Sequence, residues 1–363
     1  MKKLFFLVLV GLSFQTNLLN AQSKTENVIL ITLDGCRWQD VFTGADSVLI
    51  RNKEQTKDTA VFLKKYWRNS ASERRQVVMP FFWNTIASQG QLYGNRLYDN
   101  KMNLTNKMWF SYPGFSEIIC GFADDERINS NDLIPNPNKN VLEFLNGLPA
   151  FKGKVAAFSS WDAFPFIINE QRSGVLVNSA FEPVTGSKLT ESEILMNKLM
   201  RKVPEFIHDV RNDAFTFYQA FEYLKKNKPK VLFIALDETD DLAHMGRYDL
   251  YLNAMAYSDQ MIEELWNWIQ STPGYKNKTT MIITIDHGRG IGHEEWKSHG
   301  IKIPRADETW FAVIGPDTPA TGELKTPGQY YTNQLAASLA ALLGQTYTNE
   351  KPVGEKINSI FIK

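Results

Sequence analysis

The sequence predicts an α/β fold: a three-layer α/β/α sandwich with a mostly parallel central sheet. Apolar, β-branched runs such as Val28–Leu33, Val231–Leu236 and Met281–Ile285 are typical of strands that are buried on both faces. Segments with helical periodicity separate these runs, and such alternation favours parallel strands covered by helices on both sides. In a sheet of this kind, we expect functional residues beyond the carboxyl ends of the strands.

Each of these three runs ends on acidic residues. Asp34-Gly35 follows the first run, Asp237 follows the second, and Asp286-His287 follows the third. Aspartate and histidine together are typical ligands of a divalent metal ion. A single such pair would fit a helix cap and a surface histidine equally well. Its repetition at three strand ends favours a metal site.

The histidines fall close to the same places. The chain has five histidines, and His244 follows Asp240 by four residues, so that both side chains lie on one face of a helix. His293 and His299 follow the third run, and either of them could complete the ligand set. His208 stands in a polar stretch and is expected at the surface.

A second informative stretch reads Ser-Tyr-Pro-Gly-Phe and begins at Ser111. Pro113 suits the first turn of a helix and Gly121 suits its end. Ser111 would then stand at the helix N-terminus, where free N–H groups and the helix dipole favour a phosphate or a developing alkoxide. This pattern predicts a nucleophile; the alternatives are that Ser111 only caps the helix or that Ser116 supplies the hydroxyl.

These motifs, in the order LDG, SYPGF, D-x-x-x-H, DHG and HG, lie between Asn27 and Pro316. In this order they resemble the alkaline phosphatase superfamily of metallohydrolases. The resemblance is strongest to the nucleotide pyrophosphatase/phosphodiesterase-like branch and to bacterial proteins labelled phosphoglyceromutase-like. It implies an alkaline phosphatase-like fold and two divalent metal ions. It also favours His299 over His293, because the family places His-Gly before a strand and residues 309–314 supply one.

The resemblance further implies how the ligands are shared between the two ions. One ion would be held by Asp34, Ser111, Asp286 and His287, and the other by Asp240, His244 and His299. Mixed His and Asp ligands favour zinc, with manganese as the alternative.

The motif around Ser111 departs from the family at Gly114 and Phe115, where the phosphodiesterase-like branch usually has Asn and His. A formylglycine sulfatase would need Arg in place of Phe115, so the sequence favours phosphoric esters over sulfate esters. The predicted activity is hydrolysis of a small-molecule phosphoric ester through a phosphoseryl intermediate. Two alternatives remain: a phosphoglycerate mutase-like isomerase, and a non-catalytic metal-binding protein of the same fold.

Candidates for substrate contacts are few. Arg37 is the one basic side chain near a motif that could reach the site, and Phe115 and Trp161 are candidates for the pocket wall, although aromatic residues there suit the core equally. In the polar loop before residue 140, Asn129 or Asn131 could place an amide on the phosphoryl oxygens; otherwise they are turn residues.

The start of the chain predicts export. Two lysines precede the apolar run Leu4–Leu12, and a small residue ends the segment 1–21, as in a secretory signal peptide. We therefore expect a periplasmic or secreted protein without a membrane span after cleavage. Residues 22–363 would form the catalytic domain, with a helical excursion near residues 45–76.

Composition limits the choice of partners. Forty basic and forty acidic residues give a net charge of zero, so that no general basic field favours nucleic acid. The two cysteines, Cys36 and Cys120, are either a disulfide pair or two small buried residues.

Overall fold

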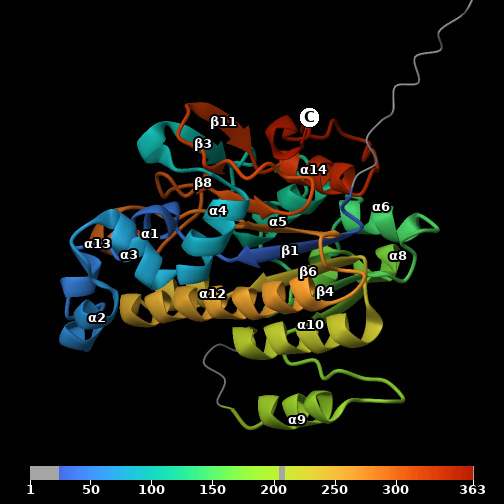
Figure 1. The fold of residues 1–363 in the computed structure, drawn as a ribbon, viewed down its shortest axis with the longest axis horizontal. Helices are drawn as coiled ribbons and strands as arrows, with labels where there is room; N and C mark the ends of the chain where they lie inside the picture. Colours follow the sequence, from blue (N-terminus) through green and yellow to red (C-terminus); the bar gives the residue numbers. More distant parts are fainter. Residues whose placement is uncertain (1–23, 204–208, 363) are drawn as a thin grey trace, which may run out of the picture.

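The computed structural model describes residues 24–203 and 209–362, so the expected signal peptide and His208 lie outside the described part (Figure 1). Eight strands form the main sheet in the order β10-β2-β9-β7-β1-β6-β4-β5, and β11-β3-β8 form a smaller one. The strands are β1 Asn27–Leu33, β2 Gln91–Tyr93, β3 Asn100–Asn103, β4 Val155–Ser159, β5 Leu176–Ser179, β6 Val231–Leu236, β7 Thr279–Thr284, β8 Glu308–Thr309, β9 Phe311–Ile314, β10 Gly322–Glu323 and β11 Gly328–Tyr331.

The helices connect these strands and flank them. The α-helices are α1 Trp38–Thr43, α2 Thr59–Tyr66, α3 Ala71–Val78, α4 Ala87–Gln89, α5 Ser111–Cys120, α6 Val141–Gly147, α7 Phe164–Ile167, α8 Glu170–Ser173, α9 Glu191–Met200, α10 Asp213–Asn227, α11 Glu238–His244, α12 Tyr248–Ser271, α13 Gly292–Glu295 and α14 Gln334–Leu342. The segments labelled η are η1 Leu49–Arg51, η2 Phe82–Ile86, η3 Arg96–Tyr98 and η4 Asn358–Ile360.

The main sheet is mostly parallel, which confirms the predicted fold class. β1 lies at its centre between β6 and β7 and is parallel to both. β4 and β5 extend the parallel part, whereas β9 runs antiparallel to β7 and β2 antiparallel to β9. Leu33 is paired with Leu236, and Thr32 with Thr284, so these three strands end side by side at one edge of the sheet.

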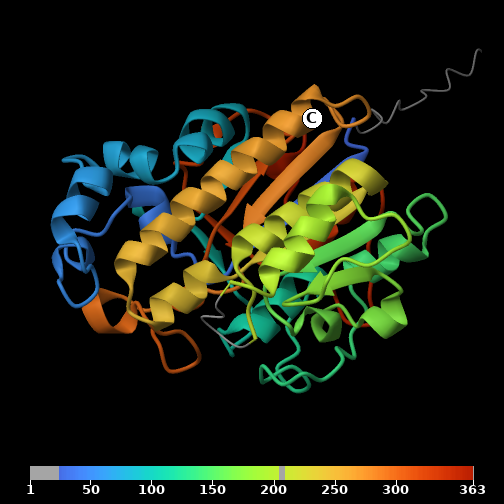
Figure 2. The ribbon, with the colours of Figure 1, turned by 90° about the horizontal axis from the view of Figure 1, so that it is seen from below.

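Two hydrophobic cores lie on the two faces of this sheet. Side chains alternate along β1: Ile29 and Ile31 belong to one core, and Val28 and Leu30 to the other. α10 and α12 cover the first face, whereas α5, α6 and α14 contribute to the core on the second (Figures 1 and 2). The arrangement is the expected α/β/α sandwich.

The two cysteines settle on opposite sides of the sheet. Cys36 belongs to the first core and Cys120 to the second, and both are buried free thiols. The structure thus favours the interpretation of two small buried residues over a disulfide.

The expected strand over residues 309–314 is divided at Trp310. β8 ends before this residue and pairs with β3 in the small sheet, whereas β9 begins after it and pairs with β7 in the main sheet. The Trp310 indole N–H donates to the Cys36 carbonyl at 2.8 Å, which fixes the point where the chain changes sheets. An apolar run read from sequence does not reveal this change of partner.

The segment over residues 45–76 contains η1, α2 and most of α3. α3 begins at a capping box in which Ser70 accepts from the Glu73 N–H and Glu73 accepts from the Ser70 N–H. In the described residues, no helix is both long enough and apolar enough to cross a membrane.

Candidate metal centre and nucleophile

The central parallel strands deliver acidic residues to one place. Asp34 directly follows β1, Asp237 follows β6, and Asp286 lies two residues beyond β7. Because β1 is parallel to both neighbours and the three strands end in register, these residues meet at the carboxyl edge of the sheet.

The inner group consists of Asp34, Asp286 and His287, whose ligand atoms all lie within 4.8 Å of one another. His287 Nε2 is 3.2 Å from Asp34 Oδ1 and 3.4 Å from Asp286 Oδ2. Asp286 Oδ1 accepts from the Gly35 N–H at 3.2 Å. All three side chains are 2% exposed or less, so that solvent does not offset their charges.

Gly35 is required by this geometry. Its φ of +56° lies in the left-handed region, and a Cβ there would lie 2.7 Å from Asp240 Oδ1 and 2.8 Å from Arg289 Nε. The glycine of the LDG motif therefore allows the tip of β1 to approach α11 closely.

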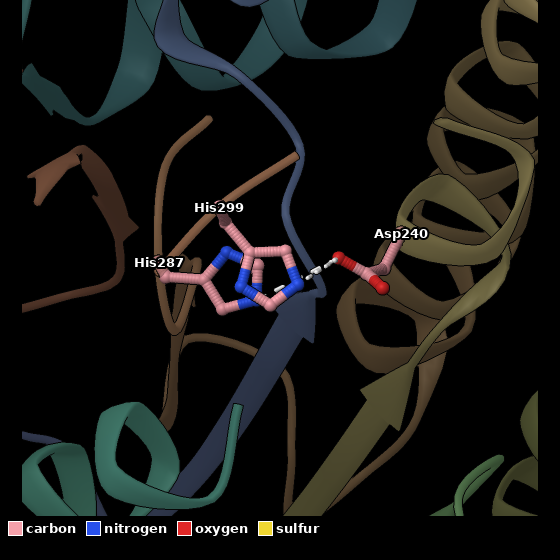
Figure 3. A group of neighbouring side chains, drawn as sticks. All are labelled: Asp240, His287 and His299. Atoms are coloured by element: carbon pink, nitrogen blue, oxygen red, sulfur yellow. Dashed lines mark ion pairs between the residues drawn. The ribbon is translucent and has the colours of Figure 1, made fainter. Parts of the chain in front are cut away.

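The outer group consists of Asp240, His244 and His299. Asp240 and His244 lie on the same face of α11, with His244 Nε2 3.0 Å from Asp240 Oδ2 and 2.9 Å from His299 Nε2. His299 Nε2 lies 3.7 Å from Asp240 Oδ1. His299 stacks on His287 of the inner group, with ring centroids 3.8 Å apart and Asp240 facing both rings (Figure 3). The two groups therefore share one site.

Hydrogen bonds of the other ring nitrogens fix two tautomers. His287 Nδ1 is 2.9 Å from the Gly288 carbonyl, and His299 Nδ1 is 3.2 Å from the Trp109 carbonyl. A carbonyl only accepts, so that each Nδ1 carries the proton and each Nε2 presents a lone pair to the site. Histidine ligands of metal ions usually donate their other ring N–H in this way.

His293 does not join either group. It lies in α13, and its side chain is 62% exposed and 3.8 Å from Glu294. Of the two candidates for the last ligand, the structure places His299 in the site and His293 at the surface.

Ser111 is the first residue of α5, and Phe110 occupies the N-cap position without a side-chain capping bond. Ser111 Oγ lies 3.3 Å from His287 Nε2, next to the inner group. The close approach of α5 to the Asp286 carbonyl accounts for the glycine at position 114, because a Cβ there would lie 2.3 Å from the Asp286 carbonyl oxygen. Ser116 instead accepts a bond from Asn136 and is 3% exposed, within the core.

The two asparagines of the polar loop differ in placement. Asn131 Oδ1 accepts from the Tyr112 N–H at 3.0 Å, one residue after Ser111. Asn129 donates to the Glu126 carbonyl at 3.3 Å, within its own turn. Of the two, only Asn131 contacts the helix that carries Ser111.

Of the three expected substrate contacts, Arg37 and Phe115 are placed differently from the sequence prediction, whereas Trp161 stays a prediction. Arg37 is 2% exposed and donates to both carboxylate oxygens of Asp40, so that its guanidinium is not available to a substrate. Phe115 is 1% exposed and stacks edge-on against Phe164 in the core. Trp161 is half-buried beside that core. Arg37 and Phe115 are therefore corrected to structural roles.

Arg289 is the residue that sequence reasoning missed. It is 1% exposed and donates from Nη2 to the Asp240 carboxylate and carbonyl, and from Nε to the Gly35 carbonyl at 3.2 Å. The signal was present, since Arg289 follows the DHG motif directly. Its distance in sequence from Asp34 and Ser111 concealed its closeness to the site.

Burial and neighbouring charges shift the pKa values of the ionisable groups in the site. Burial raises the pKa of Asp34 and of Asp286 well above the usual value, and the neighbouring carboxylates raise both further. Burial acts in the same direction on Asp240, but the charge of Arg289 and the neighbouring His299 hold its pKa well below the usual value. Burial and the nearby His287 also lower the pKa of His299 strongly, so that its ring is neutral at pH 7.

These residues fit divalent cations. Asp34 Oδ1 and Asp286 Oδ2 are buried without a hydrogen-bond partner among the described residues, although each faces the His287 lone pair. Buried acceptors that face one another are costly unless a cation lies between them. The inner group offers two oxygens and a nitrogen, and the outer group offers an oxygen and two nitrogens, both typical of zinc or manganese sites.

Comparison with known proteins agrees with this architecture. Solved structures of similar fold include alkaline phosphatase PafA (10% identity, 93% of this chain and 99% of that chain, TM-score 0.59). They also include the lipoteichoic acid synthase LtaP from Listeria monocytogenes (14% identity, 90% and 73%, TM-score 0.53) and murine ectonucleotide pyrophosphatase/phosphodiesterase 5, an inactive form in complex with AMP (14% identity, 91% and 97%, TM-score 0.53). At these identities the likeness shows the fold alone.

At the level of sequence, no curated protein matches the chain. The family model described as Sulfatase matches residues 154–345, which is more than half of the chain and contains Asp240, His244, Asp286, His287 and His299. The chain therefore belongs to the Sulfatase family, within the hydrolases of the alkaline phosphatase superfamily.

Proposed function

We propose that this chain is an exported, metal-dependent hydrolase of phosphoric esters that acts through a covalent phosphoseryl intermediate. The observation that carries the proposal is the position of Ser111 Oγ, 3.3 Å from His287 Nε2 at the start of a buried helix. Members of the family use divalent metals. The ligand atoms of Asp34, Asp286 and His287, and those of Asp240, His287 and His299, lie within 4.8 Å of one another, and His244 Nε2 lies 2.9 Å from His299 Nε2. The expected signal peptide supports export.

The residues of the chain divide the work as follows. Ser111 supplies the nucleophilic oxygen, which forms a bond to phosphorus while the bond to the alcohol oxygen breaks. At the start of α5 the Ser111 N–H would bind a phosphoryl oxygen, because the Tyr112 N–H already donates to Asn131 Oδ1 and the Gly114 N–H to the Phe110 carbonyl. The side-chain amide of Asn131, beside Tyr112, would add a second donor. Water then hydrolyses the phosphoseryl ester. Cations held by the inner and outer groups would supply the positive charge that activates the serine hydroxyl and neutralises the leaving oxygen.

The choice of phosphoric over sulfate esters rests on Phe115. Formylglycine sulfatases resemble this chain at Ser111 and Pro113 but require an arginine at position 115 for the oxidation. The chain has a phenylalanine there, which lies in the core. Both phosphatases and sulfatases occur among the structures of similar fold. The fold therefore does not distinguish phosphoric from sulfate esters, and the preference has to be argued from individual residues.

Within phosphoric esters, we propose that diesters are hydrolysed at least as well as monoesters. An enzyme for a dianionic monoester usually adds a cationic side chain to the site. Arg37 is paired with Asp40, and Arg289 with Asp240. Residues 108–110 precede Ser111 and are partly exposed, so they are our candidates for contacts with the second ester group of a diester.

A panel of matched p-nitrophenyl esters tests the proposal on the purified mature protein with added zinc or manganese. We expect the diester to be hydrolysed with a kcat/KM at least equal to that of the monoester, and the sulfate ester to be a poor substrate. A preference of about a hundredfold for the monoester, roughly 2.7 kcal/mol of transition-state discrimination, would contradict the diester part. Preferred hydrolysis of the sulfate ester would contradict the whole proposal.

The same preparation separates the two alternatives. Incubated with 3-phosphoglycerate, a mutase-like isomerase would move the phosphate between hydroxyls, whereas a hydrolase would release inorganic phosphate. A protein that binds metal but turns over none of these esters would be the non-catalytic member of the fold.

A further inference from the structure

The segment from Thr105 to Phe110 connects β3 to the nucleophile helix and has an unusual backbone. Trp109 has a φ of +54°, in the left-handed region that bulky side chains rarely adopt. Such a residue persists only when its surroundings hold it there. Two residues after this position the chain reaches Ser111, so that the conformation at Trp109 sets where α5 begins.

Asn106 holds the strained turn from within. Its side-chain oxygen accepts from the Met108 N–H at 3.1 Å and from the Trp109 N–H at 3.0 Å. A side-chain oxygen that accepts from the following backbone groups mimics a turn and fixes the peptides that bind it. Asn106 is 2% exposed, so water does not compete for these bonds.

Glu117 anchors this turn to α5. Its carboxylate accepts from the Thr105 N–H at 2.9 Å, from the Asn106 N–H at 2.7 Å and from the Asn106 side-chain amide at 2.8 Å. The side chain is fully buried, and charge-assisted bonds of this length are stronger than neutral ones. One carboxylate thus ties the loop before Ser111 to the helix that Ser111 begins.

The opposite end of the turn points at a proposed metal ligand. The Trp109 carbonyl accepts from His299 Nδ1 at 3.2 Å, which leaves the Nε2 lone pair directed towards Asp240 and His244. Rotation of the Trp109 peptide would remove this acceptor. The ring would then lose the bond that selects its tautomer.

We propose that Asn106 and Glu117 are positioning residues that hold the Trp109 carbonyl against His299 Nδ1 and thereby select the His299 tautomer that binds the outer ion. The same hydrogen bonds fix the position of Ser111 at the start of α5. The inference rests on the proposed function for its catalytic meaning. The state of His299, however, is measurable in the metal-free protein without any substrate.

A purely structural role predicts a different result. If the network only satisfies buried polar groups, its loss lowers stability but leaves the imidazole of His299 unchanged in the molecules that remain folded. If it is a positioning device, folded molecules show a mixture of His299 tautomers and bind the outer ion more weakly.

The experiment compares Asn106→Ala and Glu117→Gln with two control variants, Asn129→Ala in an exposed turn and Glu143→Gln on α6. Long-range ¹H–¹⁵N spectra of the metal-free protein resolve the tautomers, and the chain has only five histidines to assign. We expect His299 to carry its proton on Nδ1 in the parent and both controls, and to lose this preference in the two test variants. Zinc titration should show the outer ion bound at least about tenfold more weakly.

A second pair of variants covers the case in which Asn106→Ala fails to fold. Trp109→Gly accepts a positive φ and keeps the carbonyl, so that the tautomer of His299 should persist. Trp109→Pro forbids a positive φ and should abolish it. An unchanged His299 spectrum and zinc affinity in Trp109→Pro, or in either folded test variant, would overturn the proposal. If no ester is hydrolysed but the tautomer shifts as expected, the proposed function fails and the positioning role stands.

Discussion

The inner and outer groups of the candidate metal centre use the same residue types but are built differently. The inner group stands on strand tips, and His287 and Asp286 are fully buried. The outer group stands on α11 and on a loop, and the side chain of His244 is 46% exposed. A site on paired strands is fixed by their register, whereas a site on a helix and a loop depends on contacts such as the one between His299 and Trp109. We therefore expect the inner ion to be held more tightly and exchanged more slowly than the outer one.

The largest effect is expected at the nucleophile, which adjoins the inner group. Ser111→Ala removes the only oxygen of that side chain and should lower kcat by about 10³-fold or more, because no covalent intermediate can form. Asp34, Asp286 and His287 remain, so the variant should still bind metal.

The matched control is Ser116→Ala on the same helix, whose hydroxyl lies in the core beside Asn136. Its kcat should stay within a few-fold of the parent. Loss of activity in Ser116→Ala with near-normal turnover in Ser111→Ala would transfer the role to Ser116 and remove the contact with His287 from the mechanism.

Removal of a ligand from each group tests the comparison directly. The parent should bind about two divalent ions per chain, Asp286→Asn should lose the inner ion, and His244→Ala should weaken the outer ion by at least about a hundredfold. Elemental analysis after dialysis against a weak chelator measures the retained ions.

His293→Ala is the control for His244→Ala, since His293 is an exposed histidine that belongs to neither group. This variant should retain the parent's metal content. Equal metal loss from Asp286→Asn and His244→Ala, in amount and in rate, would show that register and burial do not distinguish the two groups.

The residues of the site that stand on strands and helices could be predicted from the sequence, whereas a contact made through a loop could not. The inner group follows from two apolar runs, β1 and β7, that end on acids, since parallel neighbours bring their carboxyl ends together whatever lies between them. The spacing of Asp240 and His244 also suffices, because a helix places residues four apart on one face. A tertiary partner was beyond the sequence, because Arg289 and Asp240 lie 49 residues apart in the chain. The Arg37–Asp40 pair, in contrast, joins residues three apart at the start of α1, so the spacing alone could have indicated it. The Arg289–Asp240 contact depends on how the loop after β7 packs against α11.

Gly114 illustrates the limit within a motif. As a departure from the family pattern it reads as a change in substrate contact. In the structure the glycine is needed because α5 approaches the Asp286 carbonyl so closely that a side chain at position 114 would place its Cβ 2.3 Å from that oxygen. The sequence shows which residue is unusual; only the packing shows whether the cause is a ligand or a neighbouring backbone.

The smallest expected effect is on the pH dependence of stability, and it distinguishes a buried carboxylate outside the metal centre from one inside it. Asp259 on α12 is buried, and within the described residues its carboxylate accepts from backbone, namely the N–H groups of Phe81 and Phe82 at 2.7 and 2.8 Å. Burial raises its pKa to about 7, as burial also raises the pKa of Asp286. Asp286, however, has the carboxylate of Asp34 beside it and an oxygen without a hydrogen-bond partner in the described residues.

Because the folded-state pKa of Asp259 is raised, the folded protein binds this proton more tightly than the unfolded chain does. Its contribution to the free energy of unfolding is fully present below pH 4 and falls as the pH rises to about 7, by on the order of 1 to 4 kcal/mol. Asp259→Asn should lower stability at acidic pH and flatten this part of the profile. Urea unfolding of the metal-free protein between pH 4 and 8 measures this change in the free energy of unfolding.

Added zinc should raise the melting temperature of the parent and of Asp259→Asn equally, whereas Asp286→Asn should lose part of that increase. If Asp259→Asn also loses part of the zinc-dependent increase in melting temperature, burial of a carboxylate alone would account for the response to zinc. The assignment of the ion to the inner group would then be wrong.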